Sequence, residues 1–257
     1  MITRRQFIAG GIGSAAALLS LSLVPEYKVI DQLINSIPVL LYHRVGTETD
    51  NLTISTKRFE QDMESLSQSG YNTLSLAQVK QRLQGQNSKL PDKPIIITFD
   101  DGYLDNYKNA FPVLQKYSMK ASFYIITGMM GNNDRLTASQ IREMEAAGMD
   151  FGSHTVTHRQ LAELTPQEVT NELNQSKIDL EQLLGKPVDF IAYPCGSYRP
   201  ETIQATSNAG YIGGFSTQSG FAIFNNHFTI RRIPVFHYDR SIAYVMLRKG
   251  LLASMLG

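Results

Sequence analysis

The sequence predicts an α/β fold in which parallel strands form a sheet or barrel and helices cover it. Short apolar runs alternate with amphipathic helical segments along the chain, which is the pattern of repeated β-α units. With 257 residues, the chain is long enough for one large α/β domain with a single core. Polar residues with catalytic potential also follow several of the apolar runs, as they do at the carboxyl-terminal face of such folds.

The expected strands are apolar runs rich in β-branched and aromatic residues. In chain order they cover residues 37–42, 71–74, 95–99, 121–126, 149–152, 190–193, 211–215 and 233–236. The helices between them have readable ends. Apolar residues at helical spacing from 104 to 114 indicate a helix directly after the third run. Capping boxes begin two further helices, one after Thr137 that ends near Gly148 and one after Thr165 that ends at Gly185.

Composition excludes some classes of protein. The formal net charge of +1 gives no basic excess of the kind that nucleic-acid-binding surfaces show, so we expect no nucleic-acid partner. Cys195 is the only cysteine, so no disulfide can form within the chain. The stability of the fold must therefore come from packing, with help from any bound metal.

Residues 1–24 are expected to form a segment separate from the folded domain, which spans 25–257. Arg4 and Arg5 precede a stretch rich in glycine, alanine, serine and leucine, and together they resemble a twin-arginine export signal. An ordinary export signal is the alternative. The stretch has too few strongly apolar residues for a confident membrane span, although an uncleaved N-terminal anchor is a third possibility. We therefore expect an exported protein of the periplasm or cell envelope, with membrane contact only through an uncleaved N-terminal segment.

Two segments combine the residue types of a metal-hydrolase site. Asp100 and Asp101 follow the apolar run 95–99, and His154 and His158 are four residues apart, so on a helical turn they would face the same way. One carboxylate with two imidazoles leaves coordination positions open, as catalytic zinc sites do. Alone, Asp-Gly indicates a turn and His-x-x-x-His is weak evidence for a metal. Each segment strengthens the interpretation of the other.

The segments Thr-Phe-Asp-Asp-Gly (98–102), Ser-His-Thr-Val-Thr-His (153–158) and Ala-Tyr-Pro-Cys-Gly (192–196) occur in that order. They resemble the first three motifs of the polysaccharide deacetylases, which are carbohydrate esterase family four with the NodB-homology domain. The similarity extends over residues 37–235, and the early pair Tyr42-His43 is closest to the pattern of poly-N-acetylglucosamine deacetylase-like members. The resemblance implies a distorted TIM-like (β/α) barrel with seven or eight strands in a single domain.

The family pattern also implies roles for these residues. Asp101, His154 and His158 would hold one divalent ion, with zinc expected first and cobalt or nickel as alternatives. Such an ion lowers the pKa of bound water from about 15.7 to about 7 and polarises a carbonyl. Asp100 would be the general base. Its alternative role is a carboxylate that caps a helix or supports a metal ligand.

The third motif departs from the family at Cys195, where a tyrosine is common. In the family the backbone N–H of this residue helps to bind the developing oxyanion, and a backbone donor survives a change of side chain. Such a donor is worth about 2.7 to 4 kcal/mol in the transition state. By this pattern, Pro194, Cys195 and Gly196 form the oxyanion and substrate-binding segment. A nucleophilic Cys195 thiol is the alternative, which would need a base and an electropositive site.

Two other residues of the family pattern, the arginine that orients the base and the histidine that acts as general acid, are not at their usual positions in this sequence. Many members carry an arginine shortly before the proline of the third motif, where it orients the base, but residues 190–192 here are apolar. Arg231 or Arg232 could reach across the barrel to orient Asp100, and Arg232 is the candidate. Either arginine could instead form an ion pair at the surface. For the general acid, His43 is preferred because the early histidine resembles the proton donor of the poly-N-acetylglucosamine deacetylase-like members. His237 is the alternative, and His43 could also be a hydrogen-bonded rim residue.

Together these residues predict a metal-dependent deacetylase that hydrolyses the N-acetyl amide of an N-acetylhexosamine polysaccharide in the cell envelope. The candidate polymers are peptidoglycan, poly-N-acetylglucosamine and chitin-like chains. One alternative is a carbohydrate-binding barrel with little or no catalysis, although none of the four motif aspartates and histidines is replaced. Another is a hydrolase of a different acylated amide or ester. The fold alone does not separate these functions, because barrels support many chemistries.

Overall fold

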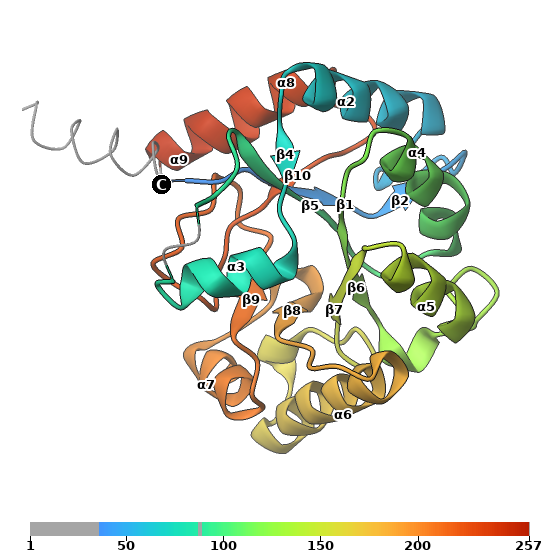
Figure 1. Ribbon diagram of the computed structural model, residues 1–257. Coiled ribbons are helices and arrows are strands. Elements are labelled where there is room, and N and C mark those ends of the chain that lie inside the picture. The colour runs from blue at the N-terminus through green and yellow to red at the C-terminus, as the bar shows by residue number, and fades with distance from the viewer. Residues whose placement is uncertain (1–35, 87–88, 257) are drawn as a thin grey trace, which may run out of the picture. The chain divides into compact units, whose positions relative to one another are not determined.

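The computed structural model describes residues 36–86 and 89–256, and within them helices surround a curved sheet of parallel strands (Figure 1). The strand order is β10-β1-β5-β6-β7-β8-β9, and β4 pairs with the start of β5. All eight predicted strands are present. Their bounds are β1 (Val39–Tyr42), β4 (Asn72–Thr73), β5 (Pro94–Phe99), β6 (Ser122–Ile125), β7 (Asp150–Ser153), β8 (Phe190–Ala192), β9 (Gly213–Phe215) and β10 (Ile233–Pro234).

The segment that contains β10 brings the two edges of the sheet together. Ile230 forms a parallel bridge with Phe215 of β9, and the Ser216 N–H donates to the Ile230 carbonyl over 2.9 Å. Five residues later, the Val235 N–H donates to the Leu41 carbonyl of β1, also over 2.9 Å. Because the same segment bonds to both edge strands, the sheet curls into the predicted distorted barrel.

Alternation of side chains along the strands separates the barrel interior from the layer under the helices. The interior cluster includes Val39 of β1, Ile96 of β5 and Tyr124 of β6. Their neighbours Leu40, Ile97 and Phe123 belong to the larger cluster that packs against the surrounding helices. Gly152 of β7 leaves room for this packing, since a Cβ atom there would lie 2.4 Å from the Tyr124 ring.

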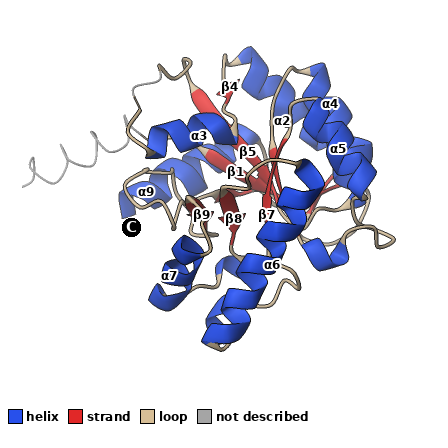
Figure 2. Ribbon diagram, turned by 60° about the horizontal axis from the view of Figure 1, so that its bottom comes forward, coloured by secondary structure: helices blue, strands red, loops and turns tan. Residues whose placement is uncertain are grey.

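Helices surround the strands and also close one end of the barrel (Figure 1 and Figure 2). Leu76, Val79 and Leu83 of α3 join the interior cluster, and the Leu76 N–H donates to Asp150 at the start of β7. Helix α3 therefore covers the amino ends of the strands. The helices are α2 (Thr56–Gln68), α3 (Leu76–Leu83), α4 (Phe111–Lys116), α5 (Ala138–Ala146), α6 (Pro166–Leu184), α7 (Pro200–Asn208), α8 (Ile242–Val245) and α9 (Ala253–Leu256).

The predicted helix boundaries are confirmed at α5 and α6. The side chains of Thr137 and Thr165 each accept the backbone N–H three residues on, and Gln140 and Glu168 complete the two capping boxes. Gly185 ends α6 with φ of 67°, a left-handed conformation that glycine adopts without strain. After β5, the helical segment begins at Leu104 and contains a π-helix (Asn106–Ala110) that continues into α4.

Two short strands were not expected from the sequence. They are β2 (Arg44–Val45) and β3 (Thr53–Ile54), which pair with each other outside the barrel sheet. The predicted export segment, 1–24, lies outside the described residues. None of the helices in residues 36–86 and 89–256 is long and apolar enough to cross a membrane.

Candidate active site

The chemistry-bearing residues follow the carboxyl ends of neighbouring strands, as the sequence predicted. His43 follows β1, Asp100 follows β5, His154 follows β7, and Tyr193 with Pro194 follows β8. The Asp100 N–H donates to the Tyr42 carbonyl over 3.0 Å, and the His154 N–H donates to the Ile125 carbonyl over 2.8 Å. These bonds extend the sheet by one residue, so both side chains lie at the edge of the barrel that α3 leaves open.

The side chains of Asp101, His154 and His158 meet in a cluster with metal-ligand geometry. Asp101 Oδ1 lies 3.4 Å from His154 Nε2 and 3.3 Å from His158 Nε2. All three ligand atoms lie within 4.8 Å of one another, and Asp101 Oδ1 is buried without a hydrogen-bond donor. In a tetrahedral zinc site, ligand atoms that are about 2.0–2.1 Å from the ion lie roughly 3.3–3.4 Å apart. These residues therefore fit a divalent ion.

Electrostatics at Asp101 agree with this fit. Burial alone would raise the pKa of Asp101, but the imidazoles of His154 and His158 hold it well below its ordinary value. The carboxylate is therefore ionised, as a metal ligand must be. The His154 ring is held on the side away from Asp101, because its Nδ1 lies 2.7 Å from the Ala192 carbonyl. A proton on Nδ1 that donates to this carbonyl leaves the Nε2 lone pair directed toward Asp101.

The prediction that the two histidines share a helical turn is wrong. His154 continues the extended backbone of β7, and Thr155 and His158 have φ of 66° and 63° in the loop that follows. The His158 N–H donates to the Thr155 hydroxyl over 3.1 Å, which closes a turn. The imidazoles meet because this loop folds back, since their rings lie 4.8 Å apart. A spacing of four residues looks the same in sequence for either geometry.

Backbone strain is concentrated at the three motifs. Besides Thr155 and His158, Asp101 and Cys195 have positive φ, of 73° and 55°. In the part of the chain that the structure describes, only Lys93 and Ser118 are further non-glycine residues of this kind. Left-handed backbone costs about 1–2 kcal/mol for most residues, and it persists where the surrounding structure enforces it, often at functional sites.

Glu172 of α6 holds the loop between the two histidines. Its carboxylate is buried and accepts the N–H groups of Val156 over 2.8 Å and Thr157 over 2.9 Å, together with the Thr157 hydroxyl. This role of Glu172 was not predicted from the sequence. The signal was a carboxylate next to Leu173 in the buried stripe of a helix, where a charge needs buried partners.

We expect Glu172→Gln to weaken metal binding about 10-fold or more, because groups that orient metal ligands typically contribute 10- to 100-fold in affinity. An amide replaces one acceptor oxygen with a donor, which opposes the loop N–H groups. Chelator competition measures the change in affinity. The matched control is Glu168→Gln, which alters a partly exposed carboxylate on the same helix, where glutamine can still complete the capping box. Equal metal affinity in the two variants would contradict a role for Glu172 in placing the histidines.

Asp100 forms a buried, bidentate ion pair with Arg232. Each carboxylate oxygen lies 2.7 Å from a guanidinium nitrogen, and Arg232 is fully buried. The guanidinium also donates to the Ser216 carbonyl over 2.9 Å and to the Thr98 hydroxyl over 3.3 Å. Burial raises the pKa of Asp100, but Arg232 and His154 outweigh it and lower the pKa below its ordinary value. Arg231 is only partly buried and makes no such contact with Asp100.

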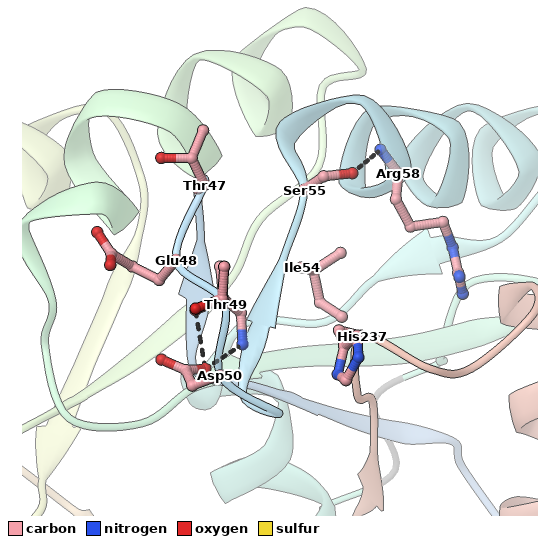
Figure 3. A pocket seen from close by; sticks show the side chains of 10 residues that line it. Thr47, Glu48, Thr49, Asp50, Ile54, Ser55, Arg58 and His237 are labelled. Carbon is pink, nitrogen blue, oxygen red and sulfur yellow. Dashed lines mark hydrogen bonds between the residues drawn. The ribbon is translucent and has the colours of Figure 1, made fainter.

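The two candidate acid histidines lie in different surroundings. The Nδ1 atom of His43 is buried and has no hydrogen-bond partner among the described residues. Burial lowers the pKa of the imidazole, and the charges of Asp100 and Asp101 partly offset this effect. His237 is exposed, packs edge-on against Tyr238 and lines a hollow that also contains Ser55 (Figure 3). Only His43 therefore shares the electrostatic environment of the aspartate pair.

Cys195 is exposed, and its backbone N–H has no hydrogen-bond acceptor among residues 36–86 and 89–256. Partial desolvation of the sulfur, together with the charges of Asp101 and Glu163, raises the pKa of the thiol above its ordinary value. A protonated thiol is a poor nucleophile, which argues against the thiol alternative. The next residue, Gly196, has φ of 66°, and a Cβ atom there would lie 2.0 Å from the Thr217 hydroxyl, so the turn requires glycine.

Comparisons with known proteins agree with this geometry. The family model for polysaccharide deacetylase matches residues 87–213. YxkH of Bacillus subtilis (strain 168), a protein assigned to the polysaccharide deacetylases, is 38% identical over 186 residues, which are 72% of this chain and 66% of YxkH. The poly-beta-1,6-N-acetyl-D-glucosamine N-deacetylase of Staphylococcus aureus (strain MSSA476) is 28% identical over 231 residues, covering 78% of this chain and 79% of that enzyme.

A solved structure shows the same fold. The Streptococcus pyogenes deacetylase PplD, in complex with acetate, superposes with a TM-score of 0.78 and 32% sequence identity. The superposition covers 83% of this chain and 97% of PplD. The sequence identity, the nearly complete coverage of PplD and the match to the family model lead to one conclusion. The chain belongs to the polysaccharide deacetylase family.

Proposed function

We propose that this protein is a metal-dependent deacetylase that hydrolyses the N-acetyl amide of an N-acetylhexosamine polysaccharide. The observation that carries the proposal is the Asp101, His154 and His158 cluster beside the ionised Asp100–Arg232 pair. A metal-ligand set next to a buried carboxylate that can take a proton suits amide hydrolysis. The similarity to a named poly-beta-1,6-N-acetyl-D-glucosamine N-deacetylase supports an N-acetylated glycan as substrate.

Asp101, His154 and His158 would hold the metal, for which zinc is the first expectation and cobalt or nickel are alternatives. When bound, a divalent ion supplies an acidified water and a polarised acetyl carbonyl. The chain itself supplies the proton transfers and the oxyanion donor. Asp100 would take the proton of the attacking water as its oxygen bonds to the acetyl carbon, and Arg232 would keep this carboxylate ionised and fixed.

Two further groups would complete the reaction. The free N–H of Cys195 would donate to the oxygen of the tetrahedral intermediate, where one such bond is worth about 2.7 to 4 kcal/mol. His43 would then give a proton to the sugar nitrogen as the carbon–nitrogen bond breaks. The products are acetate and a free amine on the glycan. Pro194 and Gly196 would shape the turn that presents the Cys195 N–H.

Acetate release from defined polymers tests this function. Purified, metal-loaded protein is incubated with peptidoglycan, poly-N-acetylglucosamine and a chitin-like chain, and we expect acetate from at least one of them. Binding of a polymer without acetate release would identify a carbohydrate-binding barrel instead. Release of acid only from small acylated amides or esters would identify a hydrolase with a different substrate class.

The proposed proton donor makes a specific prediction. We expect His43→Ala to lower turnover of an amide by about 100-fold or more, since a positioned general acid typically contributes this much. An ester whose leaving group needs no proton should lose much less, so the amide-to-ester rate ratio falls. His237→Ala should keep the ratio of the parent. If the ratio falls in His237→Ala and not in His43→Ala, the late histidine is the acid.

We also propose that the protein is exported by the twin-arginine route and acts in the periplasm or cell envelope. Arg4 and Arg5 carry this proposal, because the receptor of that route reads the arginine pair itself and not only its charge. Replacing both with lysine should trap the protein in the cytoplasm, as fractionation would show. Normal delivery of the double-lysine variant would assign the signal to the general secretory route.

A further inference from the structure

A hollow of about 570 Å³ lies among segments that follow the carboxyl ends of β1 and β10. Its walls are the loop between β2 and β3, the start of α2, and His237 from the segment after β10 (Figure 3). Strands β1 and β10 are hydrogen-bonded neighbours, and the walls follow their carboxyl ends, as His43 does. The volume is within the range of about 300–1,000 Å³ that is usual for small-ligand sites.

Several bonds fix this hollow relative to the aspartate pair. Asp105, four residues after Asp101, accepts from Arg44 Nε over 2.7 Å and from the Val45 N–H over 3.2 Å, which anchors β2. On the other side, the His237 N–H donates to the Asn51 carbonyl over 3.3 Å. The two walls are thus joined to each other and to the segment that directly follows the motif with the proposed base.

The polar groups in the hollow are arranged for a hydroxyl-rich ligand. Asp50 Oδ1 accepts the N–H groups of Leu52 and Thr53, each over 2.8 Å, and the Thr53 hydroxyl over 2.9 Å. These bonds hold the carboxylate in place, and no hydrogen bond within the described residues uses its other oxygen, Oδ2. A fixed acceptor of this kind binds a sugar hydroxyl without a further loss of side-chain entropy.

The rest of the lining complements such a ligand. Thr47 and Thr49 are exposed, and their hydroxyls both donate and accept. The exposed ring of His237 adds aromatic surface (Figure 3). Glu48 and Asp50 bring negative charge, while the positive charge of Arg58 is paired with Asp62 at 2.8 Å. The hollow therefore suits a neutral or amine-bearing sugar and disfavours an anion.

We propose that this hollow is a subsite for a neighbouring hexosamine unit of the glycan, one that is not itself undergoing deacetylation. The proposal rests on the proposed function and deepens it, because it explains how the protein distinguishes chains from single sugar units. A unit held in the hollow contributes binding energy only to substrates long enough to reach it. The catalytic efficiency kcat/KM should therefore rise with chain length.

The kinetic test uses β-1,6-linked N-acetylglucosamine oligomers of two to six units with the metal-loaded protein. In the parent, kcat/KM should be higher for the six-unit than for the two-unit oligomer. Thr49→Trp fills the hollow, and Asp50→Asn keeps the structural acceptor while it changes the free oxygen into a donor. Both substitutions should lower the ratio of kcat/KM for the six-unit oligomer to kcat/KM for the two-unit oligomer (the six-to-two ratio). We expect a decrease of about 10-fold for Thr49→Trp. Thr170→Trp, on the exposed face of α6, is the control.

Direct binding separates failure of the subsite from failure of the proposed reaction. Calorimetry with the six-unit oligomer, in the Asp100→Asn background, should show about 10-fold weaker affinity when Thr49→Trp is added. If the parent deacetylates no oligomer but this loss of affinity is found, the reaction is wrong and the subsite stands. Unchanged affinity, or a six-to-two ratio equal to that of Thr170→Trp, would overturn the subsite.

Discussion

Asp100→Asn is expected to lower kcat by about 10,000-fold while the protein still binds one metal ion. The estimate is at the upper end of general-base effects, because an amide cannot take the proton and the water then lacks any positioned base. The side chain lies 3.9 Å from His154 Nε2 and is bound by Arg232, so it is placed behind the ligand cluster and not within it. Initial rates and metal content are measured on the same samples.

Asp101→Asn provides the contrast. Its Oδ1 lies within 3.4 Å of both ligand imidazoles, so this substitution should remove metal affinity and turnover together. The two variants make the same chemical change at adjacent positions, which controls for general effects of replacing a buried carboxylate. Equal metal loss in both would show that the roles of the two aspartates are assigned wrongly.

Arg232→Met should destabilise the fold by about 3–5 kcal/mol, which is the usual cost of leaving one partner of a buried ion pair uncompensated. The partner here is Asp100, which is 2% exposed and depends on Arg232 for both of its shortest hydrogen bonds. Chemical denaturation of metal-free protein measures the free energy of unfolding. The control is Arg231→Met, the same change at a partly buried neighbour. Similar losses in the two variants would mean that the pair contributes little to stability.

The loss of stability in acid should be smaller in Arg232→Met than in the parent. In the parent, the folded pKa of Asp100 is lower than its unfolded value of about 3.9, so its contribution is present above about pH 4 and is lost as pH falls. Without Arg232, the strongest group that lowers the pKa of Asp100 is lost while burial still raises it, so the folded pKa rises. The variant should then lose less stability than the parent as pH falls below about 4, because the difference between the folded and unfolded pKa of Asp100 is smaller.

Much of the fold follows from patterns that are local in sequence. Each expected strand is an apolar run whose length and composition suffice to identify it, and the capping boxes at Thr137 and Thr165 fix two helix starts. Strands β2 and β3 have two residues each, too few for any periodicity, and β2 is anchored by Asp105 from a distant segment. Their register depends on tertiary contacts that no local pattern contains.

The candidate site was predictable where its residues follow strands, because parallel strands bring their carboxyl ends together. The contact between Asp100 and Arg232 joins residues 132 positions apart and exists only because the β10 segment closes the barrel. Sequence analysis therefore left Arg231 and Arg232 as alternatives for this position. The loop geometry of His154 and His158 depends on Glu172 from another element, so their spacing alone suggested a helical turn.

The dependence of acetate release on metal content tests the central claim most directly. The ion is removed by strong chelation, the protein is returned to buffer, and zinc, cobalt or nickel is added in steps while acetate release from the preferred polymer is measured. We expect no release from the metal-free protein and a linear recovery that reaches its plateau at one ion per chain. Undiminished acetate release from metal-free protein would contradict the proposed mechanism.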